Sequence, residues 1–333
     1  LTFEGGKGTT MLGGIKSVAR VGIALLAFAS LTACSGGDRA KSELTGWRKE
    51  VGQVRMGINA GEEDSETVQI WTVYRAYLER VIGLPVKIFQ ASDYNGIIQA
   101  VASGQVELAQ LAPASYANAD SQVGDKVMPI LTRRSADGMS GYYSVFLVRA
   151  DSPYRTIDDL AGKSIGYVDF NSTSGYLYPR WALRQQGKEP DQFFGKTAMS
   201  GGHTQSVLGL ENGQFDAIAL VAGGGTPSTG FTTGGLYQLG RRGIIDVKDF
   251  RVVWTAGPMP NSAIVVRSEL PQEFRDIVAG AMAALPYDEP ELWAQTKQSA
   301  GWDLIPTSRE NYRDIIEMRN VEIATRRSGG AKQ

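Results

Sequence analysis

The chain has 333 residues, of which 42% are hydrophobic and 21% are charged, and its formal net charge is -1. These values are typical of a soluble globular protein with room for two domains. They give no electrostatic reason to expect a nucleic-acid partner. With one histidine and one cysteine, the sequence excludes an intrachain disulfide and a metal centre rich in His or Cys. A metal site made of carboxylates alone stays possible but has no motif behind it, and we expect neither a metal nor a cofactor.

The N-terminal part of the chain has the pattern of an export signal. Residues 1–10 read as an extension ahead of a natural start at Met11. A basic region, a short apolar run at 21–31 and a small-residue cleavage site then follow. The apolar run is too short for a transmembrane span. We predict a signal peptide at 11–33 and a polar tether at 34–50.

The only cysteine lies where such a signal ends. The residues Leu31-Thr32-Ala33-Cys34 resemble the bacterial lipobox, in which the cysteine becomes the lipidated N-terminus. The alternative is a buried cysteine in an ordinary helix. The resemblance implies lipidation of Cys34, which would hold the protein at a membrane in the periplasm or at the cell surface.

A first series of strands and helices begins near Val51. Apolar runs predict strands, and helical spacing of apolar residues predicts the helices between them. This alternation indicates an α/β layer with a largely parallel sheet. The predicted strands are 54–58, 85–89, 106–111 and 127–131, and the predicted helices are 67–82, 94–103 and one that opens at Pro113.

A second series follows a long β-rich run at 141–148. It again mixes short apolar strands with helices, and apolar helices close the chain. The predicted strands are 164–168, 217–221, 252–255 and 263–266, and the predicted helices are 176–186, 204–213, 274–285, 291–298 and 309–319.

The segment 169–176, which we call the anion turn, lies between a predicted strand and a predicted helix. Free N–H groups and the positive end of the helix dipole favour an anion at such a place. Ser172, Thr173 and Ser174 each carry a hydroxyl that can donate to a tetrahedral oxyanion. The alternative is an ordinary N-cap, since Ser and Thr are common caps.

Five blocks of sequence resemble the PhnD-type phosphonate-binding proteins, the solute receptors of phosphonate ABC importers. They occur in the family's order over roughly residues 51 to 320, and their combination is specific although each block alone is weak. The blocks are SDYNGIIQ at 92–99, GYYSV at 141–145, NSTSGY at 171–176, GGHT at 201–204, and RVVW at 251–254 together with 258–266.

The resemblance implies a fold and a division into lobes. The family has the type II periplasmic binding protein fold, in which two α/β lobes joined by two crossing strands hold the ligand in a cleft. The runs 142–148 and 252–256 would be the crossing strands. The implied first lobe is 51–146 with 257–325, and the implied second lobe is 147–256.

The resemblance also implies the ligand contacts. Ser172, Thr173, Ser174 and His203 would hold the phosphonate oxygens, and Tyr94 and Tyr142 would contact the ligand from the first lobe. For His203 the alternative is a core histidine, and for the tyrosines it is ordinary half-buried packing. Tyr116 and Ser115 are weaker candidates, for which packing or capping is at least an equal alternative. Glu63 and Asp64 are also weaker candidates, for which a solvated acidic helix start is an equal alternative.

One departure from the family concerns the amine end of the ligand. Relatives that hold aminoethylphosphonate use two carboxylates, but the matching places here read AGGGT at 222–226 and PNS at 260–262. Either the ligand lacks an amine, or Glu62, Glu63 and Asp64 serve instead, because an unpartnered buried ammonium would be costly.

The resemblance implies a monomeric, non-enzymatic solute receptor that delivers ligand to an ABC permease and its cytoplasmic ATPase. The alternatives are a receptor of the same fold for phosphite, phosphate or another tetrahedral oxyanion, a receptor that reports to a sensor, and, with less support, a hydrolase. The hydrolase has less support because the sequence lacks a G-x-S-x-G elbow and a metal cluster.

Overall fold

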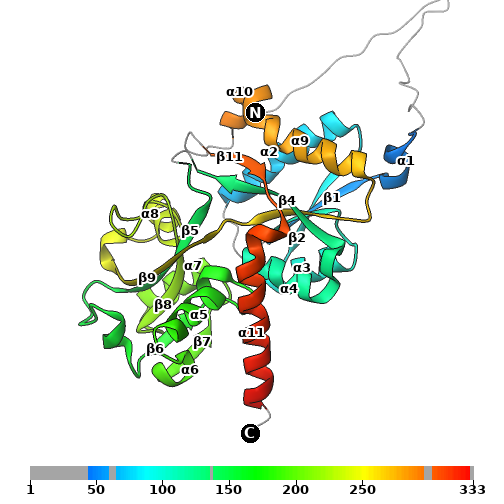
Figure 1. The fold of residues 1–333 in the computed structure, drawn as a ribbon. Coiled ribbons are helices and arrows are strands. Elements are labelled where there is room, and N and C mark those ends of the chain that lie inside the picture. The colour runs from blue at the N-terminus through cyan, green and yellow to red at the C-terminus, as the bar shows by residue number, and fades with distance from the viewer. Residues whose placement is uncertain (1–43, 60–64, 136–137, 296–301, 331–333) are drawn as a thin grey trace, which may run out of the picture. The chain divides into compact units, whose positions relative to one another are not determined.

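A computed structural model describes residues 44–59, 65–135, 138–295 and 302–330 of the chain (Figure 1). Cys34, Glu62, Glu63 and Asp64 lie outside these described residues, so the predictions about the export signal, the lipid anchor and the acidic loop stay predictions. Across the described segments, no helix combines the length and the apolar character that a membrane span requires.

The first sheet is mixed, with the strand order β11-β4-β10-β3-β1-β2. We expected a largely parallel sheet, but only β1 pairs in parallel with its neighbours β2 and β3. The chain leaves this sheet after β4 and re-enters it at β10 from the same side, so β10 runs antiparallel to β4 and β3. Its strands are β1 (Val54–Asn59), β2 (Val86–Ala91), β3 (Leu108–Leu111), β4 (Val127–Arg134), β10 (Ala263–Arg267) and β11 (Asp303–Pro306).

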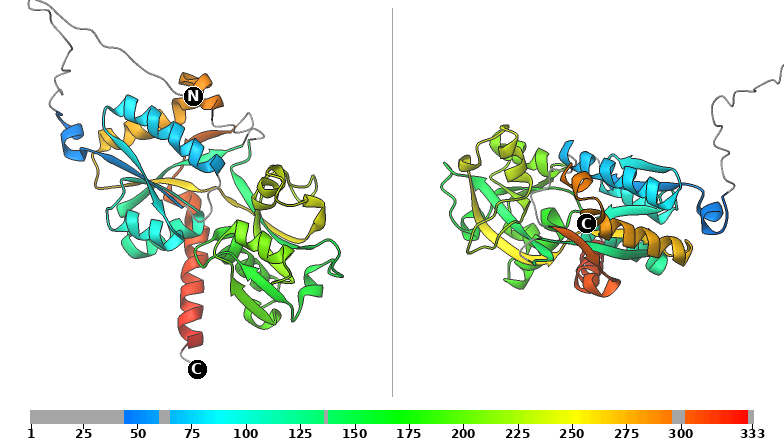
Figure 2. Two further views of the ribbon diagram at one scale, coloured as in Figure 1. Left: turned by 180° about the vertical axis from the view of Figure 1, so that it is seen from behind. Right: turned by 90° about the horizontal axis from the view of Figure 1, so that it is seen from above.

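Helices cover both faces of the first sheet (Figures 1 and 2). The side chains of β10 alternate between two hydrophobic clusters: Ile264 and Val266 pack with α2 (Ser65–Ile82) and α9 (Gln272–Asp288), whereas Ala263 and Val265 pack with α3 (Tyr94–Ala102) and α4 (Pro113–Val123). This alternation is the period-two pattern of a strand that is buried on both sides.

The body of the fold begins earlier than predicted. Residues 47–50, which we expected in the tether, belong to α1 (Trp47–Val51). The indole of Trp47 is buried, and its ring centroid lies 5.6 Å from that of Phe274 in α9. Burial of a large aromatic ring outweighs the polar composition of the neighbouring residues.

The second sheet has the order β7-β6-β8-β5-β9, with β6 parallel to β7 and β8, and β5 antiparallel to β8 and β9. We did not predict β7, because its four residues are mostly exposed and lack an apolar run. Its strands are β5 (Gly141–Arg149), β6 (Ser164–Tyr167), β7 (Lys196–Met199), β8 (Ala217–Ala222) and β9 (Phe250–Pro260). The remaining short elements are α5 (Tyr178–Gln185), α6 (Pro190–Phe193), α7 (His203–Glu211), α8 (Gly235–Arg241), α10 (Pro290–Ala294), η2 (Gly124–Lys126), η3 (Ile157–Leu160), η5 (Val247–Asp249) and η6 (Arg309–Tyr312).

Two chain passages connect the sheets, one between β4 and β5 and the other between β9 and β10. They run side by side, since Gly141 pairs with Pro260 and the N–H of Asn261 donates to the carbonyl of Ser140 over 3.2 Å. The predicted lobe boundaries at 146/147 and 256/257 fall inside β5 and β9, which pair with each other along most of their length.

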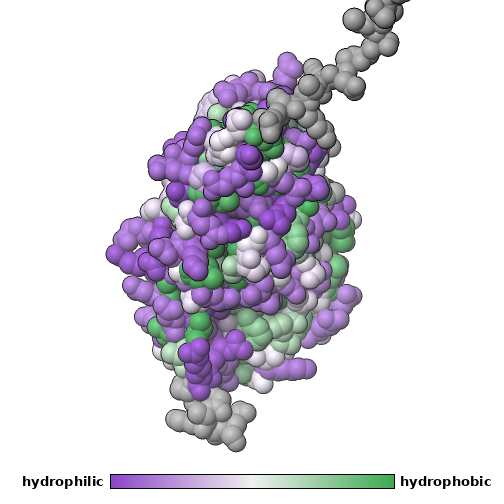
Figure 3. Space-filling view, turned by 90° about the vertical axis from the view of Figure 1, so that its right-hand side faces the viewer, coloured by the Kyte–Doolittle hydropathy of each residue, from purple (hydrophilic) through white to green (hydrophobic). Residues whose placement is uncertain are grey.

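The C-terminal helix α11 (Arg313–Gly330) is longer than the predicted helix, which ended at 319. It packs on α4 and also contacts α5 and the turn η4 (Thr173–Leu177) (Figure 1). One face of the molecule is shown in Figure 3, where hydrophobic residues are scattered among hydrophilic ones. Such scattered apolar side chains are ordinary for a protein surface.

Candidate anion-binding site

The anion turn links β6 to a helix that starts three residues earlier than predicted. Ser172 is the N-cap, and its Oγ accepts a hydrogen bond from the N–H of Gly175 over 3.1 Å. Thr173 opens a π-helical turn, η4, which leads into α5. A side chain at Gly175 would clash, because a Cβ there would lie 2.4 Å from Cγ2 of Val168. The N-cap interpretation is therefore correct, and it is compatible with anion binding because capping uses only one of the free N–H groups.

The three hydroxyl residues of the turn are buried, with 1%, 1% and 2% of Ser172, Thr173 and Ser174 exposed. The Oγ1 of Thr173 accepts a hydrogen bond from the N–H of Ala114 over 2.9 Å. The hydroxyl of Ser144 donates to the carbonyl of Ser174 over 2.7 Å. Ser172 and Thr173 thus use their oxygens as acceptors, which leaves the hydroxyl hydrogen of each able to donate.

His203 is brought to the same edge of the second sheet as the anion turn. The carboxyl ends of the parallel strands β6, β7 and β8 meet at one edge, which is where ligands bind in many α/β folds. The loop before His203 is tied to the end of β6, because the N–H groups of Ser200 and Gly201 donate to the carbonyls of Tyr167 and Val168 over 2.7 and 2.9 Å. His203 is half-buried at the first position of α7.

Tyr94 and Tyr142 come from different elements. Tyr94 is buried at the first position of α3, after the N-cap Asp93. Burial raises the pKa of Asp169 in the anion turn, and the charge of Asp93 raises it further. Tyr142 is half-buried on β5, where it pairs with Met259 of β9. A Cβ atom built at Gly223 would lie 4.0 Å from the Cβ atom of Tyr142. Tyr142 therefore lies beside the loop that follows β8.

Tyr116, a weaker candidate for ligand contact, is packed in the core. It is fully buried in α4, and its ring stacks edge-to-face on Tyr312 with centroids 5.2 Å apart. Burial raises the pKa of its hydroxyl well above the ordinary value. The structure gives Tyr116 the surroundings of a packed aromatic ring.

The anion turn is also held from α4 and α11 by three side chains, of which sequence reasoning named only Ser115, as a weaker candidate, and missed Asn118 and Arg319. The hydroxyl of Ser115 donates to the carbonyl of Asn171 over 3.0 Å, and Nδ2 of Asn118 donates to Oδ1 of Asn171 over 2.8 Å. Nη2 of Arg319 donates to the carbonyl of Phe170 over 2.9 Å. One signal could have identified Arg319, because helical spacing places it one turn after Ile315 on the buried face of α11.

The loop after β8 contains no acid at residues 222–235. It folds back on itself through the bridge between Gly223 and Thr233 and a hydrogen bond of 2.7 Å from the hydroxyl of Thr232 to the carbonyl of Gly224. The segment 260–262 is the second place where the family carboxylate is missing. Here Nδ2 of Asn261 donates to the carbonyl of Arg133 over 2.9 Å. The departure from the family therefore remains in the folded chain: both segments present neutral groups.

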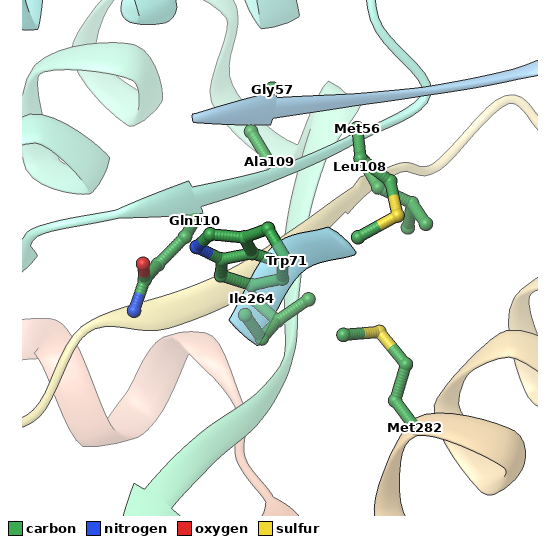
Figure 4. A pocket seen from close by; sticks show the side chains of 8 residues that line it. All are labelled: Met56, Gly57, Trp71, Leu108, Ala109, Gln110, Ile264 and Met282. Carbon is green, nitrogen blue, oxygen red and sulfur yellow. The ribbon is translucent and has the colours of Figure 1, made fainter. Parts of the chain in front are cut away.

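A small cavity of about 10 Å³ lies elsewhere, between the first sheet and the helices α2 and α9. Figure 4 shows the ring of Trp71 between Gln110 and Ile264, with the thioethers of Met56 and Met282 beside it. This volume holds about one water molecule. None of the predicted ligand contacts lines this cavity, so we regard it as a packing gap. In the described segments, no cluster of three or more acidic, His or Cys side chains could hold a metal ion.

Comparisons with known proteins identify the family. The profile of a family described as "ABC transporter, phosphonate, periplasmic substrate-binding protein" matches residues 56–312. The Phosphate-import protein PhnD of Mycolicibacterium smegmatis is 34% identical over 203 residues, which cover 59% of this chain and 61% of the relative. The Phosphonates-binding periplasmic protein of Escherichia coli is 28% identical over 264 residues, which cover 76% of this chain and 74% of the relative.

Solved structures agree on the fold. PhnD1 of Prochlorococcus marinus, solved in complex with methylphosphonate, superposes with a TM-score of 0.65 at 17% identity, covering 81% of this chain and 98% of that structure. The binding protein component of a Pseudomonas aeruginosa ABC phosphonate transporter superposes with a TM-score of 0.67 at 21% identity. The superposition covers 84% of this chain and 89% of that structure. The two mixed α/β sheets are thus those of a periplasmic binding protein. The family profile covers most of the folded body, and the chain therefore belongs to the periplasmic substrate-binding proteins of phosphonate ABC transporters.

Proposed function

We propose that this chain captures a small phosphonate or a related tetrahedral phosphorus oxyanion on the anion turn. Ser172, Thr173 and Ser174 donate hydroxyl and backbone N–H groups to the oxygens, and His203 adds a further contact at the same sheet edge. Tyr94 and Tyr142 complete the cage. One observation carries this proposal: three buried hydroxyl residues lie at the start of a helix, with Ser172 as its N-cap.

The physics of the site suits a dianion without the need for a cation in direct contact. Pre-aimed N–H and O–H donors at a helix start form short, charge-assisted hydrogen bonds to oxyanions. Ser172 and Thr173 each have a hydroxyl hydrogen left for such a bond, because their oxygens already accept from backbone N–H groups. The desolvated position of these hydroxyls strengthens each bond.

The neutral surroundings favour a ligand without an ammonium group. No acid stands at 222–226 or 260–262, and the hydrogen bonds of Gly223, Thr232 and Asn261 engage these segments with the protein itself. We propose methylphosphonate, phosphite or phosphate as the ligand class. The names of relatives include import of phosphate and binding of phosphite and phosphonates. Glu62, Glu63 and Asp64 are the alternative that would allow an amine.

Capture proceeds by closure in this proposal. The ligand docks on the anion turn, the tyrosines then close over it, and only the closed form makes both sets of contacts. The closed receptor docks on the permease of an ABC importer, which a cytoplasmic ATPase drives.

A thermal-shift panel tests the ligand class. We expect methylphosphonate, phosphite or phosphate to raise the melting temperature of residues 35–333, because a ligand that binds only the folded state stabilises it. Sulfate and methanesulfonate are the controls for a tetrahedral anion without phosphorus. A shift caused by aminoethylphosphonate alone would contradict the neutral-ligand proposal, and the absence of a shift with every phosphorus compound would contradict the capture of phosphorus oxyanions.

We propose further that Cys34 carries a lipid after cleavage of the export signal. Metabolic labelling of cells with an alkyne fatty acid should label the full-length protein and place it in the membrane fraction, because the acyl chains partition into lipid. The variant Cys34→Ala should remain unlabelled. Equal labelling of both proteins would contradict the proposal.

A further inference from the structure

A buried cation contacts the backbone of the anion turn. Arg319 lies in α11 and is 4% exposed. Its Nη2 donates to the carbonyl of Phe170 over 2.9 Å and to the carbonyl of Ala114 over 3.3 Å. Phe170 belongs to the anion turn, and Ala114 is the residue whose N–H bonds to Thr173. Arg319 therefore joins the two segments that position the Thr173 hydroxyl.

The charge of this guanidinium is not neutralised locally. Among the described residues, no carboxylate forms an ion pair with Arg319, and its Nε is buried without a hydrogen-bond partner. The carboxylate one turn along the helix, Glu322, already bonds to Arg180 and Arg184. An arginine keeps its charge even when buried, and a buried charge without a counter-ion is costly.

The groups around Arg319 do not remove this excess positive charge. Glu322, Tyr176 and Asp169 favour its charged form, whereas burial and the charge of Arg326 oppose it, and burial dominates, so the pKa of Arg319 is below its ordinary value. Asp169 itself is partly buried and has a raised pKa, because burial disfavours its charged form. A negative charge at the start of η4 would therefore balance the positive charge of Arg319, which the surrounding groups leave without a counter-ion.

We propose that Arg319 is a positioning residue for the ligand, which pins the anion turn to α4 and supplies the positive charge that a bound dianion balances. The proposal rests on the proposed function of the anion turn. Arg319 lies beyond residues 56–312, the part of the chain that the family profile matches, so the sequence blocks shared with the family do not include it. It acts through the carbonyls of Phe170 and Ala114 and not by direct contact.

The test compares Arg319→Met, Arg319→Lys and Arg327→Met by calorimetry with methylphosphonate and by melting of the ligand-free protein. Arg327 is an exposed arginine on the same helix and serves as the control. We expect Arg319→Met to weaken binding about tenfold through loss of one buried charge. Its melting temperature should not fall, because relief from the cost of burying an unpaired charge offsets the loss of two hydrogen bonds to carbonyls. Arg319→Lys should retain most of the affinity, and Arg327→Met should behave like the parent.

A second readout separates charge from mere structure. The affinity for methylphosphonate, relative to the parent protein, is measured at one pH below and one pH above the second ionisation of the ligand. Arg319→Met should lose more affinity for the dianion than for the monoanion, because the missing charge acts twice as strongly on the dianion. Equal losses at both pH values, or a lowered melting temperature with unchanged affinity, would overturn the proposal. If the parent binds and Ser172→Ala weakens binding while Arg319→Met does not, the anion turn stands and only the role of Arg319 fails.

Discussion

Replacement of Ser172 and Thr173 together by alanine is expected to lower the affinity for the phosphorus oxyanion at least about 100-fold. Each lost hydrogen bond to a charged group is worth about 1.5–3 kcal/mol, and two such bonds are removed. Calorimetry with methylphosphonate, phosphite and phosphate measures the loss. Unchanged affinity for every one of these ligands would remove the anion turn from the proposed mechanism.

The same double variant also loses structural contacts, which the experiment must separate from ligand contacts. Removal of the Ser172 cap costs about 1 kcal/mol, and the buried N–H of Ala114 loses its acceptor on Thr173 at about 1–3 kcal/mol. Thr173→Ser keeps the hydroxyl and should keep most of the affinity. Ser103→Ala with Thr197→Ala changes two exposed hydroxyls away from the anion turn and should leave binding and melting unchanged.

Glu322→Gln is expected to destabilise the protein more than any surface substitution on α11. The carboxylate is 1% exposed, accepts from the hydroxyl of Tyr176 over 2.9 Å, and bonds to Arg180 and Arg184 at 3.3 and 2.6 Å. Breaking a buried ion pair from one side costs up to about 3–5 kcal/mol. We expect a loss of about 3 kcal/mol, because Arg180 and Arg184 keep Asp191 and Glu189 as counter-ions. Urea unfolding should show this loss, and the melting temperature should fall by roughly 10 °C.

Glu317 provides the matched control, since it is an exposed glutamate on the same helix. Glu317→Gln should change the free energy of unfolding by less than about 0.5 kcal/mol. A loss for Glu322→Gln no larger than that of the control would show that the buried carboxylate adds nothing to the contact between α11 and α5.

The same carboxylate gives the stability a defined pH dependence. Burial by itself would raise the pKa of Glu322, but the charge of Arg180, and the hydrogen bonds and charge of Arg184, lower it below the ordinary value. Its contribution is therefore present above the pKa of an unfolded glutamate and is lost as the pH falls through the lowered folded pKa. In Glu322→Gln this acid-induced loss of stability should be smaller than in the parent.

Much of the fold was predictable because local patterns matched the final environment. The apolar runs of β5 and β10 are buried on both faces, so their composition alone indicated strands. The opposite holds for β7, whose exposed residues carry no apolar signal. Its place in the sheet comes from backbone pairing with β6, which a sequence pattern does not reveal.

The sequence by itself indicated the strand-to-helix turn at 169–176, because small hydroxyl residues before Gly175 are typical of a helix start, and it indicated the family, because five sequence blocks occur in the family's order. Only the tertiary structure decided that Tyr116 is packed in the core and that Thr173 bonds to Ala114. It also decided that Arg319 and Glu322 are buried on α11. These outcomes depend on contacts between residues more than 50 positions apart, and a chain pattern encodes which face of a helix is apolar but not which partner will cover it.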